Sequence, residues 1–318
     1  MSLVMHERRP EWGVGLVTST NDERLVVQFQ DGKLRSFKKG FFHMLAPVED
    51  DSIEDEVIDE LKDRFGVSIA AKAERKRQSE AAPVMTFNEQ LRVFRHLYPG
   101  GFQDETYEHS VRRDPDGRRL KRLREPAMDF AAEKLSAAAL DEMIAAGDFT
   151  GAHTISIKVL EKTSLASPSK TVDPLIDMPP ESHEAYARAL RDLLWGEGEE
   201  EFEARYKAWL DALTAGGLRE LTWPMVTVLP ALVRPDQDIA VRRKVFLAQA
   251  RTVTPNRTFK VRPAPRSYVR YRRMAEKVRE RLVEAGFQPR DMMDVHQFIW
   301  ETLRPKGQEI LSEISSGF

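Results

Sequence analysis

Residues 12–37 read WGVGLVTSTNDERLVVQFQDGKLRSF, and this stretch decides the fold of the N-terminal part of the chain. In the run 25–29, side chains at odd positions are apolar and alternate with Val26 and Gln28, which is the period of two of a half-buried strand. Turn-forming residues lie on both sides, at 21–22 and at Asp31-Gly32. The pattern predicts three short antiparallel strands in a small β-barrel of the SH3/Tudor kind.

Two glycines support a strongly bent sheet at the start of this stretch. Gly13 and Gly15 flank Val14 directly after Trp12. Glycine inside a strand is typical of positions where the backbone bends or where another group approaches closely. We therefore expect the first strand to begin at these glycines, where neighbouring side chains pack closely against the backbone.

The composition excludes several classes of protein. The 318 residues include 49 Lys+Arg against 51 Asp+Glu, so the chain as a whole is not a polyanion binder. There is no cysteine, which excludes disulfide frameworks, thiolate zinc sites and cysteine nucleophiles and favours the reducing cytoplasm. No apolar run approaches the roughly 20 residues that a membrane-spanning helix needs. We expect a cytoplasmic protein that does not enter a membrane.

Beyond residue 48 the period changes. Residues 49–64 hold nine acidic and two basic residues, and the charge then reverses before Pro83. From residue 85 onward apolar positions follow helical spacing. The predicted fold class is therefore α+β and multidomain, with an SH3/Tudor-like barrel at 1–48, a charged, partly helical linker at 49–84, and a larger, mainly α-helical domain at 85–318.

Local signals place individual helices in the larger domain. Thr86 and Glu89 form a capping-box pattern at the start of the first helix. The spacing predicts further helices near 126–147, 181–195, 200–213, 238–251, 267–285 and 290–303. Residues 154–159 are rich in β-branched side chains and could be a strand instead. We also expect a buried helix that begins at Pro224 and ends before Pro230, because proline suits a first turn and not a helix interior.

Basic residues concentrate in two runs. The first, 112–124, surrounds the turn 114–117, and its candidate nucleic-acid contacts are Arg118, Arg119 and Arg122. The second, 257–281, holds ten basic residues, and there we single out Arg266, Tyr268, Arg270, Arg273, Lys277 and Arg281. A helix capped by Ser267 would place these cations on one outer face, where they neutralise phosphates, while Tyr268 stacks on a base. The alternative is an ordinary solvated helix whose arginines pair with acidic segments.

The sequence offers no catalytic, cofactor or metal site. The seven histidines are scattered without metal-ligand spacing, and His296 is interpreted as a hydrogen-bonded packing residue. There is no phosphate-binding glycine loop and no nucleophile elbow. Glu161-Lys162 after the candidate strand is only a poor match to a nuclease motif. We expect no cofactor, and we favour a protein that is not an enzyme.

The N-terminal residues resemble a known family. The run Glu11 to Val17, followed by Val26 to Phe29, Gly32-Lys33 and the apolar pair Phe41-Phe42, is similar to the short Tudor-like domain of the DUF3553 type at the C-terminal end of UvrD/PcrA-type repair helicases. More loosely, it resembles the RNA-polymerase-interacting domain of CarD. The resemblance covers the first fifth of the chain and implies a protein-docking platform without chemistry of its own.

Two functional hypotheses follow. In the first, the protein is a bacterial adaptor whose barrel docks on a protein partner, which the resemblance implies to be RNA polymerase or a repair complex. Its contact residues would be Trp12, Phe29, Arg35 and Phe37, an aromatic and charged edge suited to strand-edge docking. We expect Trp12→Ala to abolish binding without loss of folding. In the second, the protein is an effector that binds DNA or RNA through the two basic runs, as a nuclease-associated subunit or alone.

Overall fold

The computed structural model describes residues 3–20, 23–48, 85–118, 120–255, 257 and 259–316. The chain divides into two compact units, Met1–Pro83 and Val84–Phe318. The predicted linker at 49–84 lies outside the described residues.

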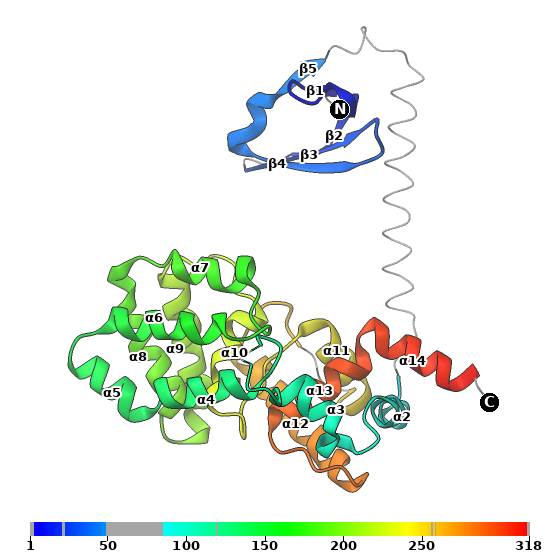
Figure 1. The fold of residues 1–318 in the computed structure, drawn as a ribbon. Helices are drawn as coiled ribbons and strands as arrows, with labels where there is room; N and C mark the ends of the chain where they lie inside the picture. Colours follow the sequence, from blue (N-terminus) through cyan, green and yellow to red (C-terminus); the bar gives the residue numbers. More distant parts are fainter. Residues whose placement is uncertain are drawn as a thin grey trace. The chain divides into compact units, whose positions relative to one another are not determined.

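The first unit is an antiparallel sheet of five strands (Figure 1). The strands are β1 (Leu3–His6), β2 (Val14–Thr20), β3 (Arg24–Phe29), β4 (Leu34–Lys38) and β5 (Leu45–Val48). They lie in the order β4-β3-β2-β1-β5, and short 3-10 segments at Pro10–Trp12 and Lys39–Met44 connect β1 to β2 and β4 to β5. The predicted α+β fold class is confirmed, as this sheet is followed by a mostly helical region.

The two glycines of the opening stretch have the roles expected of them. Gly13 has a φ of 71°, in the left-handed region that a side chain disfavours. A Cβ at Gly15 would collide with the side chains of Val27 and Phe29 on the neighbouring strand. The turn between β3 and β4 likewise uses Gly32, whose φ is 81°.

Strands β2, β3 and β4 correspond to the three strand-like runs of the opening stretch, whereas β1 and β5 carry no such signal. Each of these two strands has only four residues, and β5, at an edge of the sheet, contains Pro47. β1 pairs with β2 on one side and with β5 on the other, from Leu3 opposite Val48 to His6 opposite Leu45. A four-residue run is too short for period-two alternation to identify, so this part of the sheet depends on long-range pairing.

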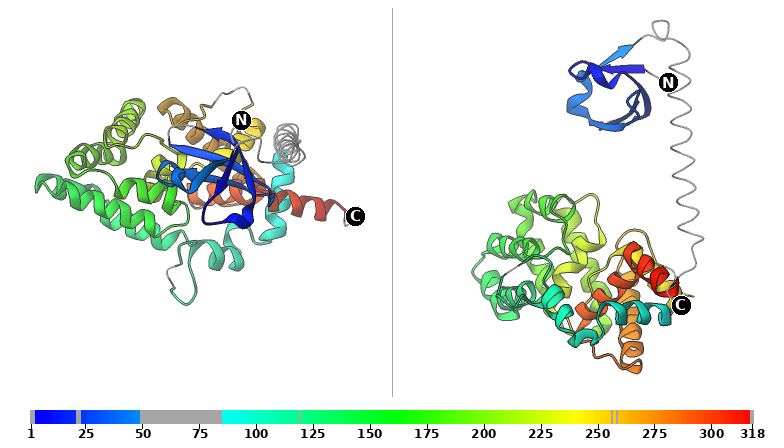
Figure 2. Two further views of the ribbon diagram at one scale, coloured as in Figure 1. Left: turned by 90° about the horizontal axis from the view of Figure 1, so that it is seen from above. Right: turned by 45° about the vertical axis from the view of Figure 1, so that its right-hand side comes forward.

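The second unit is entirely helical within the described residues (Figure 2). Its helices are α2 (Phe87–Leu97), α3 (Glu105–Tyr107), α4 (Glu125–Lys134), α5 (Ala137–Ala145), α6 (Phe149–Glu161), α7 (Asp173–Ile176), α8 (His183–Trp195), α9 (Phe202–Ala215), α10 (Trp223–Val233), α11 (Arg243–Val253), α12 (Pro265–Glu284), α13 (Met292–Leu303) and α14 (Pro305–Ser316). Short 3-10 or π turns occupy Gly101–Gln103, Glu108–Arg112, Pro168–Val172, Pro180–Ser182 and Glu199–Glu201. None of the described helices is both long and apolar enough to cross a lipid bilayer.

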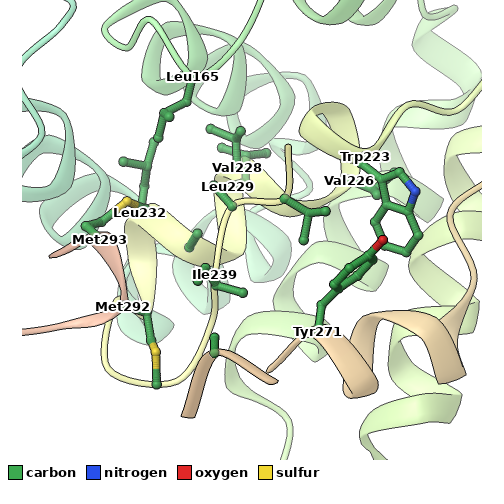
Figure 3. Packing of buried hydrophobic residues seen from close by; sticks show 14 of the residues in the cluster. Leu165, Trp223, Val226, Val228, Leu229, Leu232, Ile239, Tyr271, Met292 and Met293 are labelled. Atoms are coloured by element: carbon green, nitrogen blue, oxygen red, sulfur yellow. The ribbon is translucent and has the colours of Figure 1, made fainter. Parts of the chain in front are cut away.

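Helix α10 lies in the middle of the core of this unit. Almost all of its side chains are buried, and Leu165, Ile239, Tyr271 and Met293 pack around it (Figure 3). Thr222 caps the helix by accepting a hydrogen bond from the Met225 amide at 3.4 Å. The predicted break before Pro230 is wrong, because α10 continues through that proline to Val233. Proline has no backbone N–H and cannot donate an intrahelical hydrogen bond at position 230. The burial of apolar side chains around α10 stabilises the helix in spite of this loss.

Two further local predictions need correction. Residues 154–159 lie inside α6, so the candidate strand is a helix, whose β-branched side chains pack against neighbouring helices. Ser267 does not cap α12, which starts two residues earlier at Pro265; its hydroxyl instead accepts a hydrogen bond from the Lys260 amide at 3.1 Å. The Thr86 and Glu89 capping box at α2 is confirmed in both directions.

Candidate functional site

Aromatic side chains from separate segments meet on the N-terminal sheet. The ring centroid of Trp12 lies 5.3 Å from that of Phe29 and 6.5 Å from that of Phe37. His6, from β1, completes the cluster at 4.6 Å from Trp12 and 5.7 Å from Phe37. His6 carried no signal in the sequence, because β1 itself was not recognisable. Trp12 and Phe37 are half-buried and therefore keep part of their surface accessible.

Arg35 covers the outer face of this cluster. Its guanidinium carbon lies 3.9 Å from the centroid of the Trp12 ring, in cation–π geometry. Both terminal nitrogens donate to Asp31, Nη1 to Oδ1 at 2.8 Å and Nη2 to Oδ2 at 2.6 Å. The hydrogen bonds from Arg35 lower the pKa of the Asp31 carboxyl to about 2. Asp31, predicted only as a turn residue, thus also fixes the orientation of Arg35.

Phe29 is the one residue of the predicted docking set that cannot touch a partner. Its side chain has no exposed surface and packs with Val4, Val27 and Leu45 in the core of the sheet. It occupies an inward-facing position near the close approach at Gly15. Phe29 therefore packs against Trp12 and Phe37 from the core side of the sheet. The surface offered to a partner is made by Trp12, Arg35 and Phe37.

Strand β4 adds an open edge to this surface. In the described part of the sheet, β4 pairs with β3 and with no other strand. Arg35 and Phe37 lie on one face of β4, whereas Leu34, 53% exposed, lies on the other. Phe41, in the segment that follows β4, is 52% exposed. An unpaired strand edge flanked by exposed apolar side chains is typical of a site for strand addition.

Part of the first basic run is neutralised by carboxylates. Arg118 donates to Asp114 at 3.1 Å and also pairs with Asp116 at 3.3 Å. The turn therefore supplies the counter-charges of Arg118, and the prediction that Arg118 is a phosphate contact is not supported by its geometry. Arg122 is exposed and forms no ion pair with any described residue. Arg119 lies outside the described residues.

Other arginines of that run point into the helical unit. Arg112 is buried and binds both oxygens of Asp291, at 3.1 and 2.7 Å. It also lies 3.3 Å from Glu125 and 3.4 Å from Asp294. Arg124 is buried too and donates to Ser164 at 3.2 Å, with no carboxylate in ion-pair distance among the described residues. Arg112 and Arg124 therefore stabilise the interior of the helical unit. Their place in a basic run suggested an exposed basic surface instead.

Helix α12 presents its cations outward, as predicted. At 3.6 residues per turn, positions 266, 270, 273, 277 and 281 fall within about 80° of one another around the helix and span about 22 Å along it. Arg266, Arg273 and Lys277 are exposed and form no ion pair within the described part of the chain. Arg281 is exposed and lies over the ring of Phe87, whereas Arg270 is half-buried. We call positions 266, 270, 273, 277 and 281 the α12 stripe.

Tyr268 cannot stack on a base. It is completely buried, its hydroxyl donates to Asp238 at 3.1 Å, and its ring stacks on Tyr206 at a centroid distance of 4.6 Å. The same helical period that places the cations outside turns position 268 toward the core. The predicted aromatic contact to nucleic acid is therefore wrong.

The described residues contain no group of three or more side chains able to hold a metal ion. His296 is buried, and its Nδ1 lies 2.6 Å from the Ala240 carbonyl oxygen, in agreement with a packing role. Glu161 and Lys162 lie at the end of a helix and not after a strand, so the nuclease motif lacks its structural context.

Comparison with known proteins gives one match. A search of curated proteins and a search of solved structures each found nothing similar to the chain. Residues 2–34 match the family model described as "Protein of unknown function (DUF3553)". The matched segment runs from β1 to the start of β4 and contains Trp12, Phe29 and Asp31. The N-terminal strands of this chain are thus similar to that family.

Proposed function

We propose that the protein is a non-enzymatic bacterial adaptor whose N-terminal sheet docks on a protein partner. The observation that carries this proposal is the accessible stack of Arg35 on Trp12 beside Phe37. Tryptophan and arginine dominate the binding energy of protein interfaces. Because Asp31 and Phe29 already hold these side chains in place, little conformational entropy is lost when they bind.

The nature of the partner rests on the resemblance alone. The Tudor-like domains of UvrD/PcrA-type helicases and the related domain of CarD are docking platforms, and CarD engages RNA polymerase. We therefore propose transcription or DNA-repair machinery as the partner. The open edge of β4 supports a binding mode in which the partner adds a strand to the sheet.

A pull-down from the native cells tests the role of the sheet. The full chain and a chain that lacks residues 1–48 are compared under the same conditions. We expect polymerase or repair subunits to be recovered with the full chain and to be lost with the truncated one. Recovery of the same partners with both chains would contradict the proposal.

Nucleic-acid binding is the second candidate function, and the α12 stripe favours it. Three exposed cations without ion-pair partners on one helix face give a concentrated positive surface despite the net charge of -2. Binding of this kind weakens steeply with salt, because phosphate contacts release counterions. A gel shift at low ionic strength that disappears as salt rises supports this candidate, and the absence of any shift at low salt removes it.

A further inference from the structure

A basic groove lies between α4 and α6. It has a volume of about 820 Å³, within the range of small-molecule sites. Four lysines line it: Lys121 before α4, Lys134 at the end of α4, Lys158 in α6 and Lys162 directly after α6. No feature of the sequence predicted this group, because its members come from three separate segments.

The positive charge of the groove is poorly compensated. Lys134 pairs with Glu133 at 2.7 Å, but Lys121, Lys158 and Lys162 form no ion pair with a described residue. Glu161 is the one carboxylate among the lining side chains. Like charges held together in this way repel each other, and an anionic ligand between them removes that repulsion.

The lining of the groove is apolar between the lysines. Pro126 and Phe130 from α4 and Ile155 from α6 provide this surface. The ammonium group of Lys162 lies 4.5 Å from the centroid of the Phe130 ring. The half-buried ring of Phe130 offers a flat surface on which an aromatic ligand can lie. The groove thus combines sites for anionic groups with a surface for a ring.

We propose that the groove between α4 and α6 binds a nucleoside polyphosphate, with its phosphates among Lys121, Lys158 and Lys162 and its base against Phe130. The finite volume favours a mononucleotide over a polymer, since a nucleic-acid strand needs a row of cations that continues beyond one pocket. This inference is independent of the docking function of the N-terminal sheet, because all of its residues belong to the helical unit.

Isothermal titration calorimetry of the full-length protein tests the proposal with four probes: ATP, GTP, adenosine and inorganic tripolyphosphate. We expect ATP or GTP to bind, and adenosine and tripolyphosphate each to bind at least about tenfold more weakly, because each lacks half of the contacts. Lys158→Glu should weaken nucleotide binding by at least about tenfold. Lys207→Glu, at an exposed lysine of α9 outside the groove, should leave it unchanged.

Three results would overturn the proposal. The first is the absence of ATP and GTP binding at millimolar concentration by wild-type protein whose circular dichroism shows it to be folded. The second is tripolyphosphate binding as tightly as the nucleotides, which would remove the role of Phe130. The third is binding of a single-stranded oligonucleotide, sensitive to Lys158→Glu, without binding of mononucleotides. That last result would assign the groove to a polymer.

Discussion

Arg35 and Arg112 use the same chemistry in the two units with different consequences. Each donates two hydrogen bonds to one aspartate, Arg35 to Asp31 and Arg112 to Asp291. The side chain of Arg112 is 4% exposed, whereas that of Arg35 is 19% exposed and covers an aromatic ring. The ion pair of Arg112 therefore stabilises the interior of the helical unit. The ion pair of Arg35 orients a side chain that remains accessible to a partner.

The two basic runs show the same contrast within the helical unit. The first run follows a π turn and loops, so Arg112 and Arg118 meet carboxylates on different segments, while Arg112 and Arg124 turn inward. The second run follows a single helix, whose period separates an outer row of cations from an inner row of apolar side chains. Basic composition alone thus says little about function until the backbone path is known.

The largest expected effect separates buried from exposed arginines. Arg112→Ala should lower the free energy of unfolding of the helical unit by about 3–5 kcal/mol, because Asp291 would remain buried without its counter-charge and Asp294 would keep only its ion pair with Arg290. Burial raises the pKa of Asp294, and the charge of Arg112 opposes that rise. The matched control is Arg113→Ala, whose side chain is 57% exposed and which should cost about 1 kcal/mol or less. Urea denaturation followed by circular dichroism measures both, and equal losses would contradict the comparison.

A second effect concerns acid stability of the helical interior. Burial, together with the charge of Arg124, lowers the pKa of His296 to about 3. The folded state keeps this imidazole neutral, while the unfolded chain takes up a proton below about pH 6.5. Stability should therefore decrease as pH falls from about 6.5 toward 3, with a contribution of at most about 1.4 kcal/mol per pH unit from this residue.

Substitution of His296 isolates its share of that slope. His296→Gln should lower stability at neutral pH and flatten its decline between about pH 6 and about pH 4. His153, whose pKa burial lowers to about 4, should retain its own contribution. His96→Gln, at an exposed position of α2, is the control. An unchanged slope in the His296 variant would show that this histidine does not couple folding to pH.

A smaller effect distinguishes the two basic runs in solution. Lys277→Ala should weaken binding to duplex DNA a few-fold and reduce the slope of log affinity against log salt by about 0.9, as expected for the loss of one phosphate contact. Arg118→Ala should change neither, because Arg118 is already paired with Asp114 and Asp116. Fluorescence anisotropy over a range of salt concentrations measures both variants. Equal changes would mean that the pairing of Arg118 does not matter for binding.

The sequence predicted what local periodicity controls. Alternation identified β3, short runs between turn residues identified β2 and β4, and helical spacing identified the inner and outer faces of α12. Sequence patterns did not predict contacts between residues that are far apart in the chain. His6 joined the aromatic cluster only through β1, and Arg112 meets an aspartate 179 positions away. The lysine groove likewise needs α4 and α6 side by side.

We propose that Arg35 and Trp12 form the contact surface of an adaptor. The most direct measurement is the affinity of the full-length protein for purified RNA polymerase, by biolayer interferometry, for wild type, Arg35→Ala and Lys38→Ala. Lys38 lies on the opposite face of β4 and is exposed. Arg35→Ala leaves the aromatic rings of the cluster in contact, whereas Trp12→Ala also removes the ring that packs against Phe29.

We expect wild type and Lys38→Ala to bind alike and Arg35→Ala to bind at least about tenfold more weakly. Equal affinities for all three proteins, or no binding of wild type to the polymerase, would contradict the proposal.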